Sequence, residues 1–298
     1  MVYLVLSVLA SSLIFVVFKL FGIYKVQTLY AIIVNYITAC TVGLLYYDAP
    51  LILTEIPQKS WFPGAVALGL LFILIFNLMA ATSQKLGVSV ASVATKMSLV
   101  IPVLFGVYLY QEALTLLEVV GIILALFAVY FASLKEKKIK AEKWAFLLPL
   151  LVFLGSGMID TSIKYFQEFH MQEEEYALFS ATVFASAAVL GAIFILTKSV
   201  KKPMGINFRN VLGGICLGVP NYFSIYFLLK ALQHPMLTSA SIFTINNVAI
   251  VMLSTLLGIL LFKEVLSFKN WLGIGMAIIS IVLVALGDTI SKLLSCFF

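Results

Sequence analysis

Charged side chains are scarce in this sequence. Only 11% of the 298 residues are charged, whereas 63% are hydrophobic. Soluble chains carry about 25% charged and about 45–50% apolar residues. A soluble domain of this length has no core large enough to hide so much apolar surface. The composition therefore excludes a soluble globular protein and indicates a chain whose apolar side chains are covered by lipid.

Reactive side chains and catalytic motifs are also scarce. The three cysteines form no Cys-x-x-Cys pair, which argues against a disulfide framework or a metal site, and we predict buried, inert thiols. Both histidines, His170 and His234, fall in predicted loops, and the sequence holds no GxSxG, HExxH or phosphate-binding glycine loop. These absences predict no catalytic residues, no cofactor and no metal. The net charge of +6 lies mostly in loops between apolar segments, so it indicates no nucleic-acid partner.

Long uncharged runs are what the sequence has instead. No charged side chain occurs in Met1–Phe18, Ala65–Gln84, Val119–Leu134 or Trp271–Leu286. A helix needs about 20 residues to cross the hydrocarbon core of a membrane. A closed barrel would show weak alternation instead of long apolar runs. The first run lacks a basic start and is too long for a cleavable signal peptide. We therefore predict an all-α polytopic membrane protein.

The hydropathy pattern predicts ten transmembrane helices. Their expected ranges are 2–22, 27–47, 61–84, 87–110, 114–133, 144–166, 174–197, 210–232, 236–262 and 267–287. Most connections are short, and the charged segment 134–143 falls near the middle of the chain.

The two halves of the chain repeat one another. At a constant offset, Glu112, Leu114 and Gly106 in the first half match Glu264, Leu266 and Gly258 in the second. Each half holds five predicted spans, an odd number, so the second half must enter the membrane in the opposite sense. The pattern predicts two inverted five-helix repeats. We predict that the first repeat spans residues 1–133, the charged linker 134–143 and the second repeat 144–298.

Two copies of a helix–turn–helix signature carry a resemblance to a known family. Ser89–Phe131 and Leu237–Leu286 each contain a run of small residues, a glutamate, Leu-Thr or Leu-Ser, and the glycine of the next helix, in that order. In these features the chain resembles the EamA-type members of the drug/metabolite transporter superfamily. The resemblance implies ten helices, a central cavity between the halves and alternating access. It also implies substrates such as amino acids, other metabolites, drugs or nucleotide sugars.

Three departures from the family pattern leave the substrate open. The family often has proline where the second copy has Ser254, although the first copy retains Pro102. The first span has Ala10-Ser11-Ser12 in place of the common Trp-Gly, and Lys96 is not part of the usual pattern.

Lys96 is the first candidate for a functional side chain. It lies near the middle of the fourth span, where a charge costs at least about 2.5–3.5 kcal/mol on insertion scales. Helical spacing places Ser92, Thr95 and Lys96 on one face. We interpret Lys96 as a cavity cation that binds a carboxylate or phosphate group of the substrate. The alternative is a lysine paired with a neighbouring carboxylate or carbonyl group, or with its ammonium drawn toward the membrane surface.

Asp160 is the second candidate. Ser156, Asp160 and Lys164 follow one another at four-residue spacing on one face of the sixth span. An Asp160–Lys164 pair would neutralise itself. The alternative is a titratable carboxylate that couples transport to a proton or contacts a substrate amine. Lys19 and Lys164 lie near span ends, where we expect their stems to reach toward the surface.

Uncharged polar groups within the spans complete the candidate substrate site. Interhelical hydrogen bonding is the default for membrane asparagines, but Asn77 and Asn246 are kept as cavity candidates. Asn221 with Tyr222 and Tyr226 follows Pro220, which would free a backbone carbonyl group.

The orientation of the chain remains open. Lysine and arginine are concentrated in the loops after odd-numbered spans, which places both termini outside by the positive-inside rule. The family resemblance implies both termini inside.

The sequence favours a secondary transporter in a bacterial inner membrane, a monomer or homodimer, that exports a small metabolite such as an amino acid or related organic anion. Its partners would be the solute and the lipid bilayer, with a coupling proton as a further candidate. The alternatives are a proton-coupled exporter of drugs or hydrophobic cations and, least favoured, a non-transporting membrane sensor or enzyme.

Overall fold

The computed structural model describes residues 2–46, 54–102, 104–105, 115–133, 147–171, 175–199, 207–232 and 239–297. Within these residues the chain forms the ten α-helices given below, a further helical stretch that begins at residue 100, one short 3-10 helix, η1 (Ile56–Gln58), and no strand. The first five α-helices are α1 (Val2–Ile23), α2 (Thr28–Leu45), α3 (Phe62–Lys85), α4 (Val88–Met97) and α6 (Leu116–Ser133). The other five are α7 (Leu147–Phe169), α8 (Tyr176–Ser199), α9 (Phe208–Leu232), α10 (Ser239–Phe262) and α11 (Phe268–Phe297).

The helices have the length and composition that a membrane requires. Six of them, α1, α2, α3, α8, α9 and α10, are long and apolar enough to cross a bilayer, and shorter apolar segments lie in the other four. Large apolar side chains such as Val5, Leu9 and Leu13 of α1 are exposed at the surface of the bundle. In water such a surface would be unfavourable, whereas lipid covers it.

The fourth predicted span, 87–110, is not a continuous helix. α4 ends at Met97, Ser98 and Leu99 form a turn, and helical structure resumes at residue 100. Pro102 has no N–H to donate to the carbonyl oxygen of Ser98, and its ring disfavours a regular helix at that carbonyl. The N–H of Ile101 donates to Ser98 O at 2.9 Å instead. The prediction of one unbroken span was wrong at this point, and residues 106–110 lie outside the described part.

The last predicted span, 267–287, is too short. α11 continues as far as Phe297. The added segment contains no proline, and polar residues such as Asp288 and Ser291 can remain helical without lying inside a bilayer. Hydropathy alone ended the prediction where the apolar run ended.

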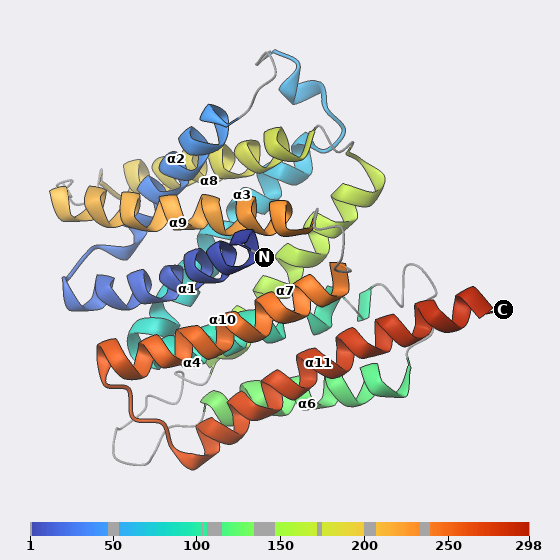
Figure 1. Ribbon diagram of the computed structural model, residues 1–298. Coiled ribbons are helices and arrows are strands. Elements are labelled where there is room, and N and C mark those ends of the chain that lie inside the picture. Colours follow the sequence, from blue (N-terminus) through green and yellow to red (C-terminus); the bar gives the residue numbers. More distant parts are fainter. Residues whose placement is uncertain are drawn as a thin grey trace.

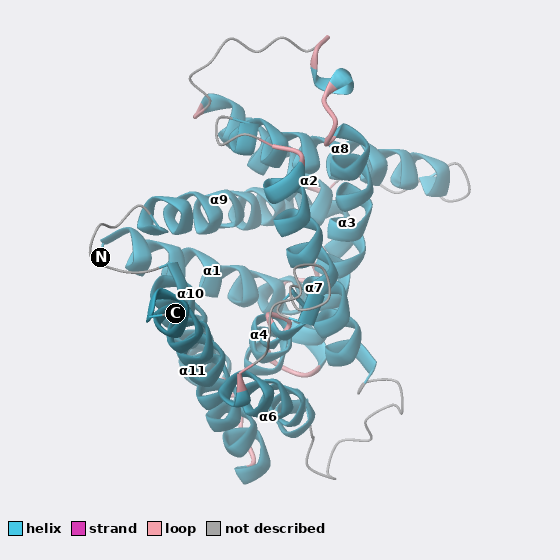
Figure 2. Cartoon of the chain, turned by 90° about the vertical axis from the view of Figure 1, so that its right-hand side faces the viewer, coloured by secondary structure: helices cyan, strands magenta, loops and turns pink. Residues whose placement is uncertain are grey.

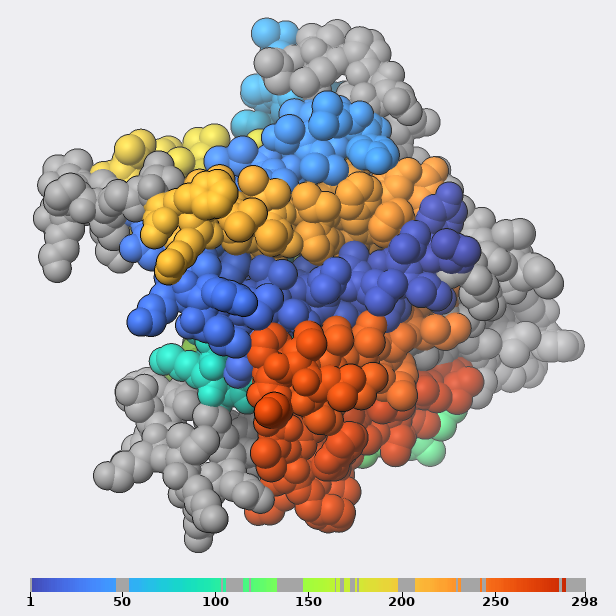
Figure 3. Space-filling view, turned by 60° about the vertical axis from the view of Figure 1, so that its left-hand side comes forward, coloured from blue at the N-terminus to red at the C-terminus, as the bar shows by residue number. Residues whose placement is uncertain are grey.

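The helices pack in an ordered bundle. α6 and α11 pair at one edge, away from α2 and α8 (Figures 1 and 2). α1 lies between α9 and α10 in the space-filling view (Figure 3). α2 packs on α8 and α9, α3 on α7 and α8, and α4 on α7 and α10. The largest buried cluster includes Phe18, Tyr36, Trp61 and Leu68.

Close helix contacts depend on small residues. A Cβ atom added to Gly273 of α11 would lie 2.4 Å from the backbone nitrogen of Ala132 in α6. A Cβ atom added to Gly69 of α3 would lie 2.8 Å from the backbone nitrogen of Ala187 in α8. Membrane helices approach closely through such positions because lipid provides little hydrophobic drive for helix association.

One face of the bundle is referred to below as the Glu264 face. α10 ends and α11 begins there, at the left of Figure 1, and the ends of α1 and α3 and the beginning of α4 meet at the same place. The C-terminus lies toward the opposite face (Figure 1).

Candidate functional site

Asp160 of α7 faces the interior of the bundle and is nevertheless exposed. The outer face of α7 presents the exposed side chains of Leu154, Met158 and Tyr165. Asp160 follows Met158 by two residues, which turns it by about 200° to the opposite side of the helix. Asp160 is exposed, and its carboxylate lies 3.5 Å from the Ser98 hydroxyl of α4, so it faces a neighbouring helix and not the outer surface of α7.

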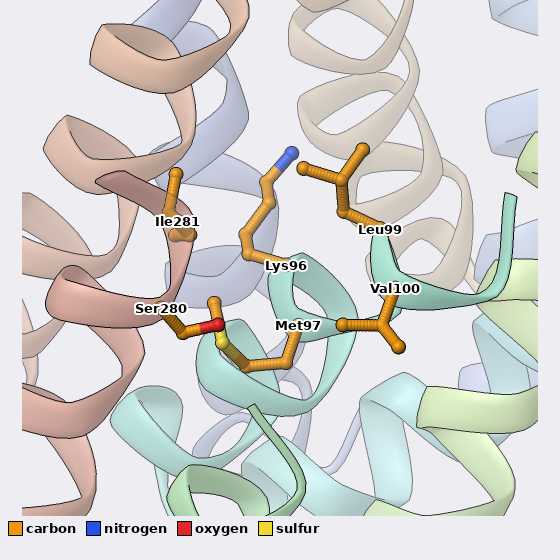
Figure 4. A pocket seen from close by; sticks show the side chains of 6 residues that line it. All are labelled: Lys96, Met97, Leu99, Val100, Ser280 and Ile281. Atoms are coloured by element: carbon orange, nitrogen blue, oxygen red, sulfur yellow. The ribbon is translucent and has the colours of Figure 1, made fainter. Parts of the chain in front are cut away.

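Lys96 lies on the adjacent helix, α4, in its last turn. Together with residues of α11 it lines a small pocket of about 180 Å³, including the open mouth. Figure 4 shows the lysine side chain extending away from Ser280, with its ammonium group passing between Leu99 and Ile281. Apart from Lys96 and Ser280, the side chains that line this pocket are apolar.

The break in α4 connects these two charged residues. The Ser98 hydroxyl donates to the carbonyl oxygen of Thr95 at 2.6 Å, and Asp160 Oδ2 lies 3.5 Å from the same hydroxyl oxygen. Ser98 is fully buried. A turn in α4 therefore meets the side chain of Asp160, and Pro102 is the residue that produces the turn.

The two charges attract one another without forming a direct contact. The Lys96 ammonium and the Asp160 carboxylate interact electrostatically, but the pair has no N–O distance within 4.0 Å among the described residues. A direct pair would neutralise both groups. A separated pair leaves both charges able to bind a solute with opposite charges or to exchange a proton.

Three more candidates lie on the same two helices. Thr95 donates to the carbonyl oxygen of Ala91 at 2.8 Å, and Ser92 donates to that of Ser89 at 3.0 Å. Both hydroxyl protons are used within α4. The buried hydroxyl of Ser156 on α7, in contrast, has no hydrogen-bond partner among the described residues.

The candidates on α9 lie at a different interface. The amide of Asn221 donates to Asn35 Oδ1 of α2 at 3.2 Å, and both residues are buried. Tyr222 and Tyr226 stack with ring centres 6.0 Å apart and contact Tyr46 at the end of α2.

α9 also continues through Pro220 without interruption. Because Asn221 contacts Asn35 and the two tyrosines contact Tyr46, the structure places Asn221, Tyr222 and Tyr226 between α2 and α9 and not beside Lys96.

Asn77 and Asn246 lie on α3 and α10. Asn77 is partly buried and donates to the carbonyl oxygen of Ile73 in its own helix at 2.7 Å. Asn246 is 2% exposed, and its Oδ1 has no hydrogen-bond partner among the described residues. α10 packs against α4, so Asn246 belongs to a helix that borders the site, whereas the amide of Asn77 is satisfied locally.

Lys19, which we expected to reach toward the membrane surface, has its ammonium 3.5 Å from Glu264 Oε1, and that expectation stays a prediction. The expectation of buried thiols was wrong for one cysteine. Cys216 is exposed on α9 rather than buried. The proposed pairing of Asp160 with Lys164 stays a prediction, since the side chain of Lys164 lies outside the described residues.

The sequence did not single out Ser98, Ser280 or the contact partners of Glu264. Ser98 precedes Pro102 by four residues, and this spacing alone identifies the carbonyl group that the proline leaves without its usual donor. Ser280 donates to the carbonyl oxygen of Gly121 at 2.7 Å and thereby joins α11 to α6. No local sequence pattern predicts this long-range contact.

Metal binding has no support in the described part of the chain. No group of three or more histidine, cysteine, aspartate or glutamate side chains is close enough to hold an ion there. Among the described residues, the chemistry available at the site consists of one ammonium, one carboxylate, hydroxyls and backbone carbonyl groups.

Comparison with known proteins gives a consistent result. The model of the EamA-like transporter family matches residues 1–134 and 142–286. An uncharacterised protein of Haemophilus influenzae is 30% identical over 277 residues, which cover 91% of this chain and 93% of the relative. A protein of known crystal structure, 15% identical, has a TM-score of 0.59, and the match covers 95% of this chain and 98% of that one. This last similarity concerns the fold alone.

Proposed function

The chain belongs to the EamA-like transporter family, and on this basis we propose that it is a secondary transporter that exports a small metabolite with an anionic group by alternating access. Family membership makes it a membrane transporter of the drug/metabolite transporter superfamily, whose members are transporters rather than enzymes. The substrate class, the direction and the mechanism are the proposed part.

The pattern of helix contacts supports an inverted repeat. Exchanging the five helices of one half for those of the other pairs α1 with α7, α2 with α8, α3 with α9, α4 with α10 and α6 with α11. Under this exchange the α1–α9 contact becomes α7–α3, α2–α9 becomes α8–α3, and α1–α10 becomes α7–α4, and all of these pairs pack together. Inverted repeats that meet around a midplane site are typical of secondary transporters.

The exposed, inward-facing carboxylate of Asp160 carries the proposal. A carboxylate within a predicted span is costly unless it has a partner or reaches water. Asp160 is exposed and lies beside the broken part of α4, with Lys96 nearby but not in contact. In this arrangement Lys96 binds the anionic group of the solute. Asp160 accepts a substrate amine or a coupling proton, so an amino acid or related organic anion fits both charges.

A flux assay in proteoliposomes tests the role of Lys96. Lys96→Ala should reduce the uptake of anionic solutes at least about tenfold, since hydrogen bonds to charged groups contribute about 1.5–3 kcal/mol. The matched control is Lys230→Ala, which removes an exposed lysine of α9 that lies over the Tyr226 ring. Unchanged anion flux in Lys96→Ala would exclude the anion-contact role.

A proton-coupled exporter of hydrophobic cations is the second candidate. The aromatic group of Tyr46, Tyr222 and Tyr226, with ring centres 5.4–6.0 Å apart, favours it, because tyrosine faces attract cations. Lys96 counts against it. Asp160→Asn distinguishes the two functions: loss of pH-gradient-driven efflux of a cationic dye, with no anion flux in the native protein, would establish this second function.

We also propose that the protein resides in a bacterial inner membrane, with both termini outside as the distribution of lysine and arginine indicates. A reporter fused after Phe298 tests the orientation. A reporter signal from the cytoplasm would reverse it without affecting the site.

A further inference from the structure

The carboxylate of Glu264 binds the beginning of a helix from the other half of the chain. The backbone N–H of Val88 donates to Glu264 Oε1 at 2.9 Å, and the Ser89 hydroxyl donates to Oε2 at 3.4 Å. Glu264 lies in the segment between α10 and α11, and its side chain is 11% exposed. A carboxylate at a helix N-terminus accepts from N–H groups that lack a helical partner, and the helix dipole favours its charge.

A lysine extends this contact to two further helices. Lys19 Nζ of α1 lies 3.5 Å from Glu264 Oε1 and 3.4 Å from the carbonyl oxygen of Gln84 in α3. The ends of α1 and α3, the beginning of α4 and the α10–α11 segment therefore meet at one carboxylate. We call these interactions of Glu264 with Val88, Ser89 and Lys19 the Glu264 contact.

The local backbone leaves room for the carboxylate and little else. Gly87 has a φ of 119°, and a Cβ atom there would lie 2.9 Å from Glu264 Oε1. A Cβ atom on Gly258 would lie 2.6 Å from Oε2. Lys263 adopts a φ of 52°, which is uncommon for a residue other than glycine and costs about 1–2 kcal/mol. Strain of this kind persists only where surrounding contacts hold it.

The two faces of the bundle differ in how tightly they are packed. α1 packs on α3 and α4, and the hydroxyl of Ser83 in α3 donates to the carbonyl oxygen of Phe15 in α1 at 3.0 Å. Under the exchange of halves the equivalent pairs are α7 with α9 and α7 with α10. In the described part of the chain these equivalents do not pack to a comparable extent. Among the described residues, the helices are therefore more tightly packed at the Glu264 face than at the equivalent place opposite.

We propose that the Glu264 contact holds the Glu264 face closed and must break whenever that face opens to admit or release solute. This inference rests on the alternating access proposed above. Glu264 joins the second half of the chain to α4 through Val88 and Ser89 and to α1 through Lys19, so the second half cannot separate from these two helices while the Glu264 contact is intact. Breaking the contact shifts the population toward the state that is open at this face.

Cysteine labelling measures this opening directly and needs no substrate. The reporter is Ser92→Cys, which replaces a fully buried hydroxyl of α4 one turn inside Ser89. A membrane-impermeant maleimide is applied from the Glu264 face of the reconstituted full chain, with the native cysteines Cys40, Cys216 and Cys296 changed to serine. With Glu264 intact, labelling should be slow. Glu264→Ala should raise its rate about tenfold, as expected for the loss of a hydrogen bond to a charged group. Glu264→Gln, which keeps an acceptor oxygen, should give a smaller rise.

Glu175→Gln is the matched control. It removes a glutamate that pairs with Lys59 at 2.8 Å, away from the Glu264 face, and should leave the labelling rate unchanged. Lys19→Met is the second variant, should Glu264→Ala fail to fold, and it should also raise the rate. If the native protein carries anions but the Glu264 and Lys19 variants label no faster than the protein with both residues intact, the inference is overturned and the proposed function stands. Faster labelling in a protein that carries no anion would instead retain the Glu264 contact and remove the proposed substrate.

Discussion

α4 and α10 occupy corresponding places in the two halves and pack against each other. They differ in continuity, because the chain is interrupted by a turn directly after α4, whereas α10 is unbroken. Pro102 follows α4, and the chain turns at Ser98 and Leu99. At the matching repeat position α10 has Ser254, and this helix is continuous from Ser239 to Phe262.

The charged residue Lys96 and the contact between Ser98 and the Asp160 carboxylate belong to the broken helix, α4. α10 contributes a buried asparagine in an unbroken helix. The comparison shows that one architecture places a broken helix with a polar site beside a continuous helix.

Breaking α10 should have the largest effect. Ser254→Pro should remove a main-chain hydrogen bond and destabilise the protein by about 3 kcal/mol or more, measured as a loss of folded protein and a lower melting temperature in detergent. Ser254→Ala is the control. Its hydroxyl donates within the helix to Val251 O at 3.2 Å, so its removal should change stability little. Normal stability of Ser254→Pro would show that α10 does not need continuity.

Strain at the beginning of α4 should have the next largest effect. Gly87→Ala places a Cβ atom beside Glu264 on a backbone with φ 119°, and should cost about 1–3 kcal/mol. Gly275→Ala is the matched control, since a Cβ atom on this α11 glycine has no neighbour within 4 Å. Equal melting temperatures for the two variants would contradict the prediction.

Restoring α4 should reduce transport more than stability. Pro102→Ala supplies the missing N–H and should allow α4 to continue, which moves Ser98 relative to Asp160. We expect anion flux in proteoliposomes to fall about tenfold, as for the loss of one hydrogen bond of about 1.4 kcal/mol, without a fall in melting temperature. The control is Pro220→Ala in α9, which is already continuous. Full anion flux in Pro102→Ala would show that transport does not depend on the turn at Ser98 and Leu99.

Asn246 of α10 should show the smallest effect. Its buried Oδ1 has no partner in the described residues, so Asn246→Leu should leave the melting temperature unchanged or raise stability by up to about 1 kcal/mol. Thermal unfolding in detergent checks this, with Asn35→Leu as the comparison, because that change leaves the buried amide of Asn221 unpaired. Destabilisation by Asn246→Leu equal to that by Asn35→Leu would mean that Asn246 is satisfied after all.

The helical architecture was predictable because apolar runs of membrane length and short polar connections determine it. The ranges of α1, α3 and α10 agree closely with the predicted spans. The break after Met97 was missed because hydropathy does not register which carbonyl group a proline deprives of its donor. Pro102 was visible in the sequence, but its consequence at Ser98 was not drawn.

The candidate site was predictable in part. Lys96 and Asp160 stood out because charges within spans are rare, and the structure places them on neighbouring helices. Asn221 joined the candidates by proximity to Pro220 and Tyr222, whereas its contact with Asn35 depends on how α2 packs on α9. The partner of Lys19 was missed for the same reason. Its partner lies in the other half of the chain, and no local spacing reveals that.

The packing of α2 on α9 has a consequence for motion. Gln27 and Asn210 exchange two hydrogen bonds at one end of this pair, and Asn35 meets Asn221 further along. Between them, a Cβ atom on Gly214 would lie 2.7 Å from the carbonyl oxygen of Ala31. A slide by one helical turn, about 5.4 Å, would break every one of these contacts. Sliding of the two halves past one another would therefore break all of these contacts, whereas the alternating access proposed above requires only that the halves tilt about the α2–α9 pair.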